Sequence, residues 1–320
     1  MGTVLITGGA GFIGSHLTRK LLKEGYSVIC VDNLLTGSMQ NVRDLEGNPQ
    51  FRFVEQDVAT PHDLNLYGKE KIEYVFHLAS PASPNKNSPK SYIAFPIETM
   101  LVNSVGTYHM LLLAKHHGSR FLFASSSEVY GDPAESPQKE TYFGNVNPIG
   151  PRSVYDEGKR FGEAMTFGFV RKHDVNARAV RIFNTYGPLM QKDDGRVVSN
   201  FINQALVNQP LTIYGDGSQT RSFCYVDDLV DGLWSAMISE GTKGEVFNLG
   251  NPDERTIKEL AELIKSKTKT SSELEFLDLP EDDPKRRKPD IAKAERILSW
   301  SPKVSVEDGL EKTITYFSSL

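Results

Sequence analysis

The sequence contains little cysteine, no large excess of one charge and no long apolar run, and each of these features excludes a class of protein. Its two cysteines, Cys30 and Cys224, lie in separate apolar, strand-like stretches, so we expect buried thiols rather than a disulfide. No apolar run approaches the roughly 20 residues of a membrane span. Because residues 4–6 already form an apolar, strand-like stretch, there is no room for a signal peptide, and we expect a reducing, cytoplasmic location.

Charge and metal-ligand patterns narrow the partners further. The net charge of −5 gives no reason to expect a nucleic acid or an anionic membrane surface as a partner. An anionic small substrate would then require basic side chains placed locally. No group of His, Cys, Asp and Glu has the spacing of a metal site, and the serines lack the G-x-S-x-G pattern of a hydrolase. We therefore expect neither a metal nor serine-hydrolase chemistry.

The first 32 residues have the pattern of a dinucleotide-binding unit. An apolar strand at residues 3–7 is followed by a glycine-rich turn, a helix and a second strand that ends at Asp32. Gly9, Gly11 and Gly14 fit G-x-G-x-x-G, and Asp32 lies 18 residues beyond Gly14. Such glycines let backbone N–H groups approach a pyrophosphate, and the acid accepts hydrogen bonds from a ribose, which favours NAD over NADP. The alternative is a glycine-rich turn that only packs the helix on the strand. The strand, the glycine spacing, the helix and the acid together favour a cofactor site instead.

Strands and helices continue to alternate, which predicts an α/β fold with a Rossmann-type, doubly wound parallel sheet. After about residue 185 strands and helices no longer alternate regularly, and we expect a smaller C-terminal α/β lobe that binds the substrate at the carboxyl ends of the strands. The predicted NAD-binding domain spans residues 1–185, with residues 222–240 returning to it. The predicted nucleotide-sugar-binding lobe comprises residues 186–221 and 241–320.

A set of proton-handling residues follows the strand at residues 121–124. The strand ends in serines and Glu128, and a later helix places Tyr155 and Lys159 at i and i+4 on one face. A tyrosine titrates near ~10, and an adjacent ammonium would lower that pKa. Tyr155 could then take a proton from a hydroxyl while a hydride leaves the same carbon for NAD, with Ser126 holding that hydroxyl. On their own, Tyr155 and Lys159 would more often be ordinary surface residues of a helix. Because the glycine motif precedes them, we expect them to be catalytic.

The chain resembles the extended short-chain dehydrogenase/reductases, which include the nucleotide-sugar epimerases, dehydratases and decarboxylases. Within that family it is most similar to the UDP-glucuronate decarboxylases. The resemblance covers essentially the whole chain. The shared family motifs lie at residues 8–14, 77–80, 125–131, 155–159 and 181–187, and the narrower matches lie at residues 80–84, 127–132, 147–152, 155–160, 194–201, 217–221, 282–284 and 287–290.

The resemblance implies a reaction. Oxidation at the sugar C4 by Tyr155 and NAD creates a ketone β to the C6 carboxylate, so carbon dioxide can leave; protonation at C5 and return of the hydride then give UDP-xylose, with tightly held NAD recycled. Glu128 stands at the position of the family's acid, although a capping or loop carboxylate is the alternative. Ser127 replaces the aspartate that protonates the leaving hydroxyl in 4,6-dehydratases, and a serine cannot do this.

The resemblance also implies the site residues. We expect catalysis by Ser126, Glu128, Tyr155, Lys159 and Arg287. Expected cofactor contacts are Gly8, Gly11, Phe12, Ile13, Gly14, Asp32, Asn33, Asp57, Val58, Leu78, Ala79, Tyr155 and Lys159. Expected substrate contacts are Ser80, Pro81, Asn184, Arg196, Val197, Tyr214, Gln219, Arg221 and Arg287. Two alternatives stay open: Arg287 could belong to a solvated basic run at 285–288, and Tyr214 could be simple packing.

Three functions remain open: UDP-glucuronate decarboxylation, another nucleotide-sugar conversion (C4 epimerisation or 4,6-dehydration), and a non-catalytic NAD-binding regulator. Ser127 counts against dehydration, Glu128 against a simple epimerase, and the intact Ser126, Tyr155 and Lys159 set against a regulator. The segment 85–91 is longer than the decarboxylase pattern, and Ser126 replaces a threonine, so the identity of the sugar is where the resemblance is weakest. The resemblance also implies a UDP-sugar substrate and a homodimer, packed through helices near residues 100–115 and 154–172.

Overall fold

The computed structural model describes residues 1–61, 63–279 and 286–320. Its centre is a seven-stranded sheet in which every neighbouring pair is parallel. The order is β11-β6-β5-β4-β1-β2-β3, so the direction of winding reverses between β1 and β4. The predicted doubly wound parallel sheet is therefore confirmed. The strands are β1 (Thr3–Thr7), β2 (Ser27–Asp32), β3 (Phe51–Glu55), β4 (Ile72–His77), β5 (Arg120–Ser126), β6 (Ala177–Ile182) and β11 (Val246–Leu249).

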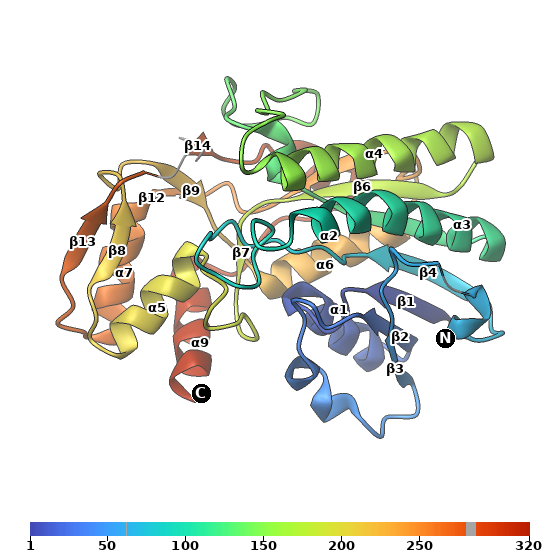
Figure 1. Cartoon of the computed structure of the whole chain (residues 1–320), viewed down its shortest axis with the longest axis horizontal. Helices are drawn as coiled ribbons and strands as arrows, with labels where there is room; N and C mark the ends of the chain where they lie inside the picture. The colour runs from blue at the N-terminus through green and yellow to red at the C-terminus, as the bar shows by residue number, and fades with distance from the viewer. Residues whose placement is uncertain (62, 280–285) are drawn as a thin grey trace.

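Helices cover both faces of this sheet (Figure 1). One face carries α2 (Pro96–Leu101), α3 (Thr107–His117) and α4 (Ser153–His173), and the other carries α1 (Phe12–Lys23) and α6 (Val226–Ile238). Successive side chains of a strand point to opposite faces. Leu122 therefore packs in the core shared with α1 and α6, whereas Phe121 and Phe123 pack in the core shared with α3. This two-sided burial explains why the central strands are apolar throughout.

The predicted helix near residues 100–115 begins earlier, at Pro96, and is divided by a π-helical turn at Val102–Gly106. Asn103 lies in this turn and is fully buried. Its amide nitrogen donates to the Ser80 hydroxyl at 2.9 Å and to the Thr99 carbonyl at 2.8 Å. The turn thus ties the helix to the end of β4, where Ser80 follows the strand.

The smaller lobe combines short strands with α5 (Val197–Leu206), α7 (Ile257–Thr268) and α9 (Val306–Ser318). Its strands pair as β8 with β13, β7 with β10, and β9 with both β12 and β14. Their bounds are β7 (Thr185–Tyr186), β8 (Leu211–Tyr214), β9 (Thr220–Ser222), β10 (Cys224–Tyr225), β12 (Glu254–Thr256), β13 (Leu274–Leu277) and β14 (Arg286–Arg287).

The predicted lobe boundary at residue 241 needs correction. β11 lies beyond it but pairs with β6 in the large sheet, where Phe247 and Leu249 are fully buried. α8 (Ala292–Leu298) also packs against β11. Burial of these apolar side chains stabilises the pairing of β11 with β6, although the two strands lie far apart in the sequence. The division into two domains stays a proposal, with β11 assigned to the larger one.

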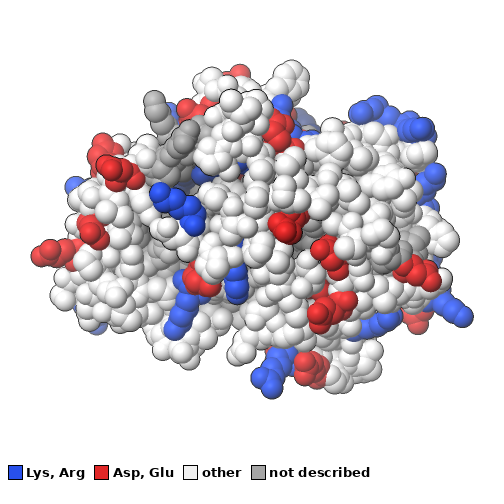
Figure 2. Space-filling model, in the orientation of Figure 1, with Lys and Arg blue, Asp and Glu red and all other residues white. Residues whose placement is uncertain are grey.

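Further features of the composition appear in the structure. Cys30 and Cys224 are both buried and unpaired, as predicted. Within residues 1–61, 63–279 and 286–320, no helix combines the length and apolar character that crossing a bilayer requires. On the face shown in Figure 2, the basic and acidic side chains of the described residues are interspersed.

A close helix–strand contact generates a stability prediction. A Cβ on Gly162 of α4 would lie 2.1 Å from the Phe123 ring, whereas a Cβ on Gly168 of the same helix would meet nothing within 4 Å. We expect Gly162→Ala to destabilise the fold by about 1–3 kcal/mol because the ring must move. Gly168→Ala should be neutral or stabilising by up to ~1 kcal/mol through helix propensity. Urea unfolding of both variants measures this, and equal midpoints would contradict the tight contact.

Candidate active site

A cavity of 820 Å³ lies at the carboxyl ends of the strands and extends to the smaller lobe. Its walls include residues that follow β1, β2, β4, β5 and β6, together with residues of the lobe strands β8 and β9. The winding reverses between β1 and β4, and open α/β sheets bind their ligands outside such a reversal. The fold therefore places the predicted site residues around one cavity.

The glycine-rich turn after β1 forms one end of this cavity. Gly8 has φ +69°, and a Cβ on Gly14 would lie 2.1 Å from the Gly8 carbonyl oxygen. Gly11 precedes the first turn of α1, and no side chain caps that turn. The turn is thus closely packed, and the N–H groups at the start of the helix are left for a ligand on the cavity side. A Cβ on Gly9 would instead strike the Cys30 sulfur, so Gly9 serves packing.

Asp32 lies beside this turn at the end of β2. Its carboxylate is buried and accepts hydrogen bonds from the backbone nitrogens of Ala10 at 3.0 Å and Leu34 at 2.9 Å. Burial raises the pKa of the Asp32 carboxyl. These two bonds fix the carboxylate but use only part of its acceptor capacity, so it can still accept from the hydroxyls of a ribose. The turn and the acid together fit NAD.

The other predicted cofactor residues also lie at the cavity. Asn33 donates its side-chain amide to the Asp57 carboxylate at 3.2 Å, which links the ends of β2 and β3. The predicted cofactor contacts that line the cavity are Gly8, Gly11, Phe12, Ile13, Gly14, Asp32, Asn33, Asp57, Val58, Leu78, Ala79, Tyr155 and Lys159.

The predicted catalytic serine, tyrosine and lysine meet at the middle of the cavity. Tyr155 is 7% exposed and Lys159 3% exposed, both on α4. Ser126, the last residue of β5, is hydrogen-bonded to the Tyr155 phenol. The Lys159 ammonium donates to the Ala124 carbonyl at 2.9 Å and lies 5.5 Å from the centre of the Tyr155 ring. The structure therefore brings together the three groups that sequence spacing predicts.

The expected lowering of the tyrosine pKa by Lys159 is not found in the protein alone. Burial raises the pKa of Tyr155 to about 12, although the hydrogen bond with Ser126 and the charge of Arg196 lower it in part. Burial also lowers the pKa of Lys159 to about 7. The physical reason is that a charged form of either group is poorly solvated here. An additional positive charge in the cavity is needed before the phenolate is favoured.

Glu128 lies beside this group in the 3₁₀ turn Ser127–Tyr130. One of its oxygens, Oε2, accepts from Arg152 at 2.5 Å and from Arg287 at 3.1 Å. Burial opposes ionisation, but the charges of Arg287 and Arg152 lower the pKa of Glu128 to about 2. Ser126 provides the cap of the turn, so the alternative reading of Glu128 as a capping carboxylate is wrong.

Arg287 occupies a different position from the one expected for a substrate contact. It is 1% exposed, donates to the Ser127 carbonyl at 2.7 Å and lies behind Glu128, away from the cavity wall. The alternative of a solvated basic run is therefore wrong for this residue. It is buried because β14 pairs in parallel with β9, which sets Arg287 opposite Arg221. Residues 282–284 and Lys285, which belong to the matched motif and the basic run, lie outside the described residues.

The remaining predicted substrate contacts also line the cavity, some after β4 and β6 and others in the lobe. Arg196 forms a bidentate pair with Asp194, at 2.5 and 2.7 Å, and its guanidinium lies 5.8 Å from the centre of the Phe12 ring. Gln219 donates to the Tyr214 carbonyl at 2.6 Å. Predicted substrate residues at the cavity are Ser80, Pro81, Asn184, Arg196, Val197, Tyr214, Gln219 and Arg221.

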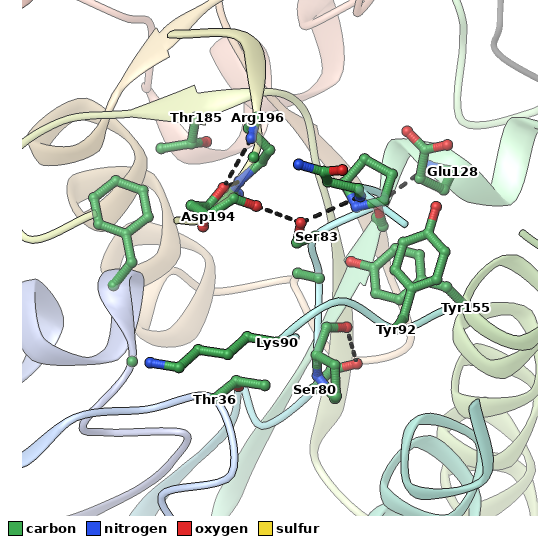
Figure 3. A pocket seen from close by; sticks show the side chains of 18 of the residues that line it. Thr36, Ser80, Ser83, Lys90, Tyr92, Glu128, Tyr155, Thr185, Asp194 and Arg196 are labelled. Carbon is green, nitrogen blue, oxygen red and sulfur yellow. Dashed lines mark hydrogen bonds and ion pairs between the residues drawn. The ribbon is translucent and has the colours of Figure 1, made fainter. Parts of the chain in front are cut away.

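Sequence reasoning missed two residues next to the catalytic group. The Tyr92 ring stacks on the Tyr155 ring with a centroid distance of 4.9 Å and an interplanar angle of 11° (Figure 3). Arg152 lies at the cavity and pairs with Glu128. Arg152 belongs to the motif at residues 147–152, which offered a signal. Tyr92 follows a proline-rich, aperiodic stretch, and no spacing rule pointed to it.

Comparison with known proteins gives concordant results. The model of the NAD dependent epimerase/dehydratase family matches residues 4–250. UDP-glucuronic acid decarboxylase 1 of Danio rerio is 52% identical over 315 residues, which are 98% of this chain and 72% of that protein. UDP-glucuronic acid decarboxylase 2 of Arabidopsis thaliana is 51% identical over 314 residues, 98% of this chain and 68% of that protein. The solved UDP-glucuronic acid 4-epimerase of Bacillus cereus, in complex with UDP-glucuronic acid and NAD, is 31% identical with a TM-score of 0.86, covering 99% of each chain.

The buried lysine gives a pH prediction for the cofactor-free protein. The pKa of Lys159 falls from 10.5 to about 7 on folding, so between these values the unfolded chain binds a proton that the folded chain does not. The free energy of unfolding of the wild type, relative to Lys159→Met, should therefore rise with pH by up to ~1.4 kcal/mol per unit. Urea unfolding at pH 7, 8 and 9 measures the slope. Lys172→Met, which removes an exposed lysine of α4, is the control; a wild-type slope equal to that of Lys159→Met would refute the prediction.

Proposed function

The chain belongs to the NAD dependent epimerase/dehydratase family, and from this premise we propose that it is a UDP-glucuronate decarboxylase. The observation that carries the proposal is the identity of about half of all residues, over 98% of the chain, with curated UDP-glucuronic acid decarboxylases. The enzyme converts UDP-glucuronate to UDP-xylose and carbon dioxide with the help of NAD. The predicted family, reaction and cofactor are confirmed by these relatives.

The cofactor site is the end of the cavity formed by the glycine-rich turn and Asp32. The N–H groups at the start of α1 would hold the pyrophosphate, and the Asp32 carboxylate would hold a ribose. When bound, NAD accepts a hydride from a carbinol carbon and later returns it. Its positive charge would also favour the phenolate form of Tyr155.

Proton transfer at the sugar C4 falls to Tyr155. The phenolate takes the proton of the C4 hydroxyl, and Ser126, already hydrogen-bonded to the phenol, orients that hydroxyl. Lys159 holds its ammonium against the Ala124 carbonyl, within reach of the tyrosine ring. The resulting 4-ketone lies β to the C6 carboxylate. When the C5–C6 bond breaks, its electrons move into the ketone as an enolate and carbon dioxide leaves.

The charged group around Glu128 distinguishes this reaction from its alternatives. Glu128 stays ionised between Arg152 and Arg287, so it supplies a fixed negative charge and a hydrogen-bond acceptor close enough to Tyr155 to act on its pKa. Arg287 acts through Glu128 and the Ser127 backbone. Ser127 carries no carboxyl that could protonate a leaving hydroxyl, which disfavours 4,6-dehydration. Epimerisation would retain the carboxylate of the substrate.

We also propose a homodimer and a cytoplasmic location. Large apolar side chains are exposed on α2, α3 and α4, in and next to the two helices through which the family resemblance implies a homodimer; they are Ile97, Met100, Leu101, Tyr108 and Phe161. An exposed apolar patch of this kind supports a subunit interface. The two unpaired, buried thiols support a reducing compartment.

An NMR time course tests the reaction. With UDP-glucuronate, we expect the C5 and carboxylate signals to disappear as UDP-xylose signals grow, without net NADH. UDP-glucose and dTDP-glucose should stay unchanged over the same time. Tyr155→Phe is the control, because it removes the acid–base hydroxyl while keeping the stacked ring, and should bind NAD but produce nothing. A UDP-sugar product that keeps its carboxylate would show an epimerase instead.

Substitution of Arg287 tests the role of the charged group. The planar guanidinium of Arg287 donates to both the Glu128 carboxylate and the Ser127 carbonyl. Arg287→Lys replaces it with a single ammonium, which cannot reproduce this paired geometry. We expect kcat for decarboxylation to fall about tenfold or more, equivalent to ~1.4 kcal/mol, while NAD affinity is kept. Arg286→Lys, on the exposed neighbour in β14, is the matched control. Normal turnover by Arg287→Lys would remove Arg287 from the mechanism.

A further inference from the structure

The segment at residues 85–91, which departs in length from the decarboxylase pattern, brings a lysine to the cavity. Lys90 is partly buried and lines the cavity wall. In the view of Figure 3, its side chain extends away from the Tyr92 and Tyr155 rings in the direction of Thr36, which lines the same cavity. The segment therefore contributes a cation to the cavity at a distance from the catalytic tyrosine.

The backbone that carries Lys90 is held in place. Ser88 and Ser91 on either side are buried, at 4% and 0% exposure. The Ser88 hydroxyl accepts a hydrogen bond from the backbone nitrogen of Lys90 at 3.3 Å, and the Ser83 carbonyl accepts one from the backbone nitrogen of Tyr92 at 3.1 Å. Because the chain is fixed before and after Lys90, the direction of its side chain is set by the fold rather than by solvent.

Arg152, Arg196 and Lys159 of the cavity each have a partner within the protein, whereas the Lys90 ammonium has none among the described residues. Arg152 is paired with Glu128, Arg196 with Asp194, and Lys159 donates to a carbonyl. Across residues 1–61, 63–279 and 286–320, no side chain or carbonyl forms a hydrogen bond or ion pair with the Lys90 ammonium. A cation held at a cavity wall without a counter-charge is suited to an anionic ligand.

Two diphosphates could supply that anion, one in NAD and one in the UDP-sugar. The position of Thr36 favours NAD. The next residue, Gly37, packs so closely on Asp32 that a Cβ there would lie 2.7 Å from the carboxylate oxygen. The Thr36 carbonyl also accepts a hydrogen bond at 2.7 Å from the side chain of Gln191, another residue of the cavity wall, and this bond holds Thr36 in place. Lys90 therefore faces the dinucleotide end of the cavity.

We propose that Lys90 is a cofactor-binding residue whose ammonium pairs with the diphosphate of bound NAD. The glycine-rich turn offers that diphosphate only backbone N–H groups and a helix end, which leaves its two negative charges without a side-chain counter-ion from that turn. Lys90 supplies one. The inference requires NAD but not the decarboxylation, so it can fail or hold independently of the reaction.

Calorimetric titration of cofactor-free protein tests this assignment. Lys90→Met keeps the length of the side chain and removes its charge. We expect it to bind NAD and ADP-ribose about tenfold more weakly, with a smaller dependence on salt, and to bind adenosine and UDP-glucuronate as the wild type does. Lys90→Arg should retain most of the affinity for NAD. The control is Lys172→Met, which removes an exposed lysine of α4 that does not line this cavity and should leave all four affinities unchanged.

Three outcomes overturn the proposal. If Lys90→Met binds NAD as tightly as the wild type, the ammonium has no role in the cofactor site. If only UDP-glucuronate binding weakens, the lysine serves the diphosphate of the substrate instead. If adenosine binding weakens as much as ADP-ribose binding, the effect comes from a disturbed wall rather than a lost charge. Equal melting temperatures of Lys90→Met, Lys90→Arg and the wild type establish that both variants are folded.

Discussion

The catalytic part of the cavity depends on how closely α4 approaches the end of β5. The absence of a side chain at Gly162 lets the helix lie against the Phe123 ring, and Glu163 then reaches the Ser125 hydroxyl at 2.6 Å and the Arg181 guanidinium at 2.8 Å. One turn earlier, Lys159 reaches the Ala124 carbonyl. These contacts fix the helix rotation that presents Tyr155 to Ser126, so the packing of α4 on β5 determines the geometry of proton transfer.

Electrostatics in this site are set by burial rather than by exposed charge. Tyr155 and Lys159 lose solvation together, and their pKa values move in the directions that favour the neutral forms. Glu128 escapes this effect because two guanidiniums share one of its oxygens. The nearby Asp156 carboxyl is shifted toward its neutral form, because burial and the Glu128 charge raise its pKa to about 8. Two buried neighbours on the same side of the cavity, Glu128 and Asp156, thus have pKa values shifted in opposite directions, because Glu128 has two guanidinium partners.

Much of the fold could be predicted because its signals are local. The strand, glycine turn and acid of the first unit, and the i, i+4 spacing of Tyr155 and Lys159, each follow from rules that act over a few residues. Arg287 could not be placed in this way, since a basic run looks solvated until β14 pairs with β9 and buries it. The stacking of Tyr92 on Tyr155 and the return of β11 to the sheet likewise depend on contacts between distant segments.

The position of β11 affects how the polypeptide reaches its native state during synthesis. One core joins Val4 and Leu122 of the large sheet with Leu229 and Trp234 of α6 and Phe247 of β11. A nascent chain released only as far as β6 therefore lacks both the outer strand of its sheet and α6, one of the two helices that cover this face. Until residues beyond 249 have left the ribosome, we expect that edge and the part of the face under α6 to stay open to chaperones that shield apolar surface.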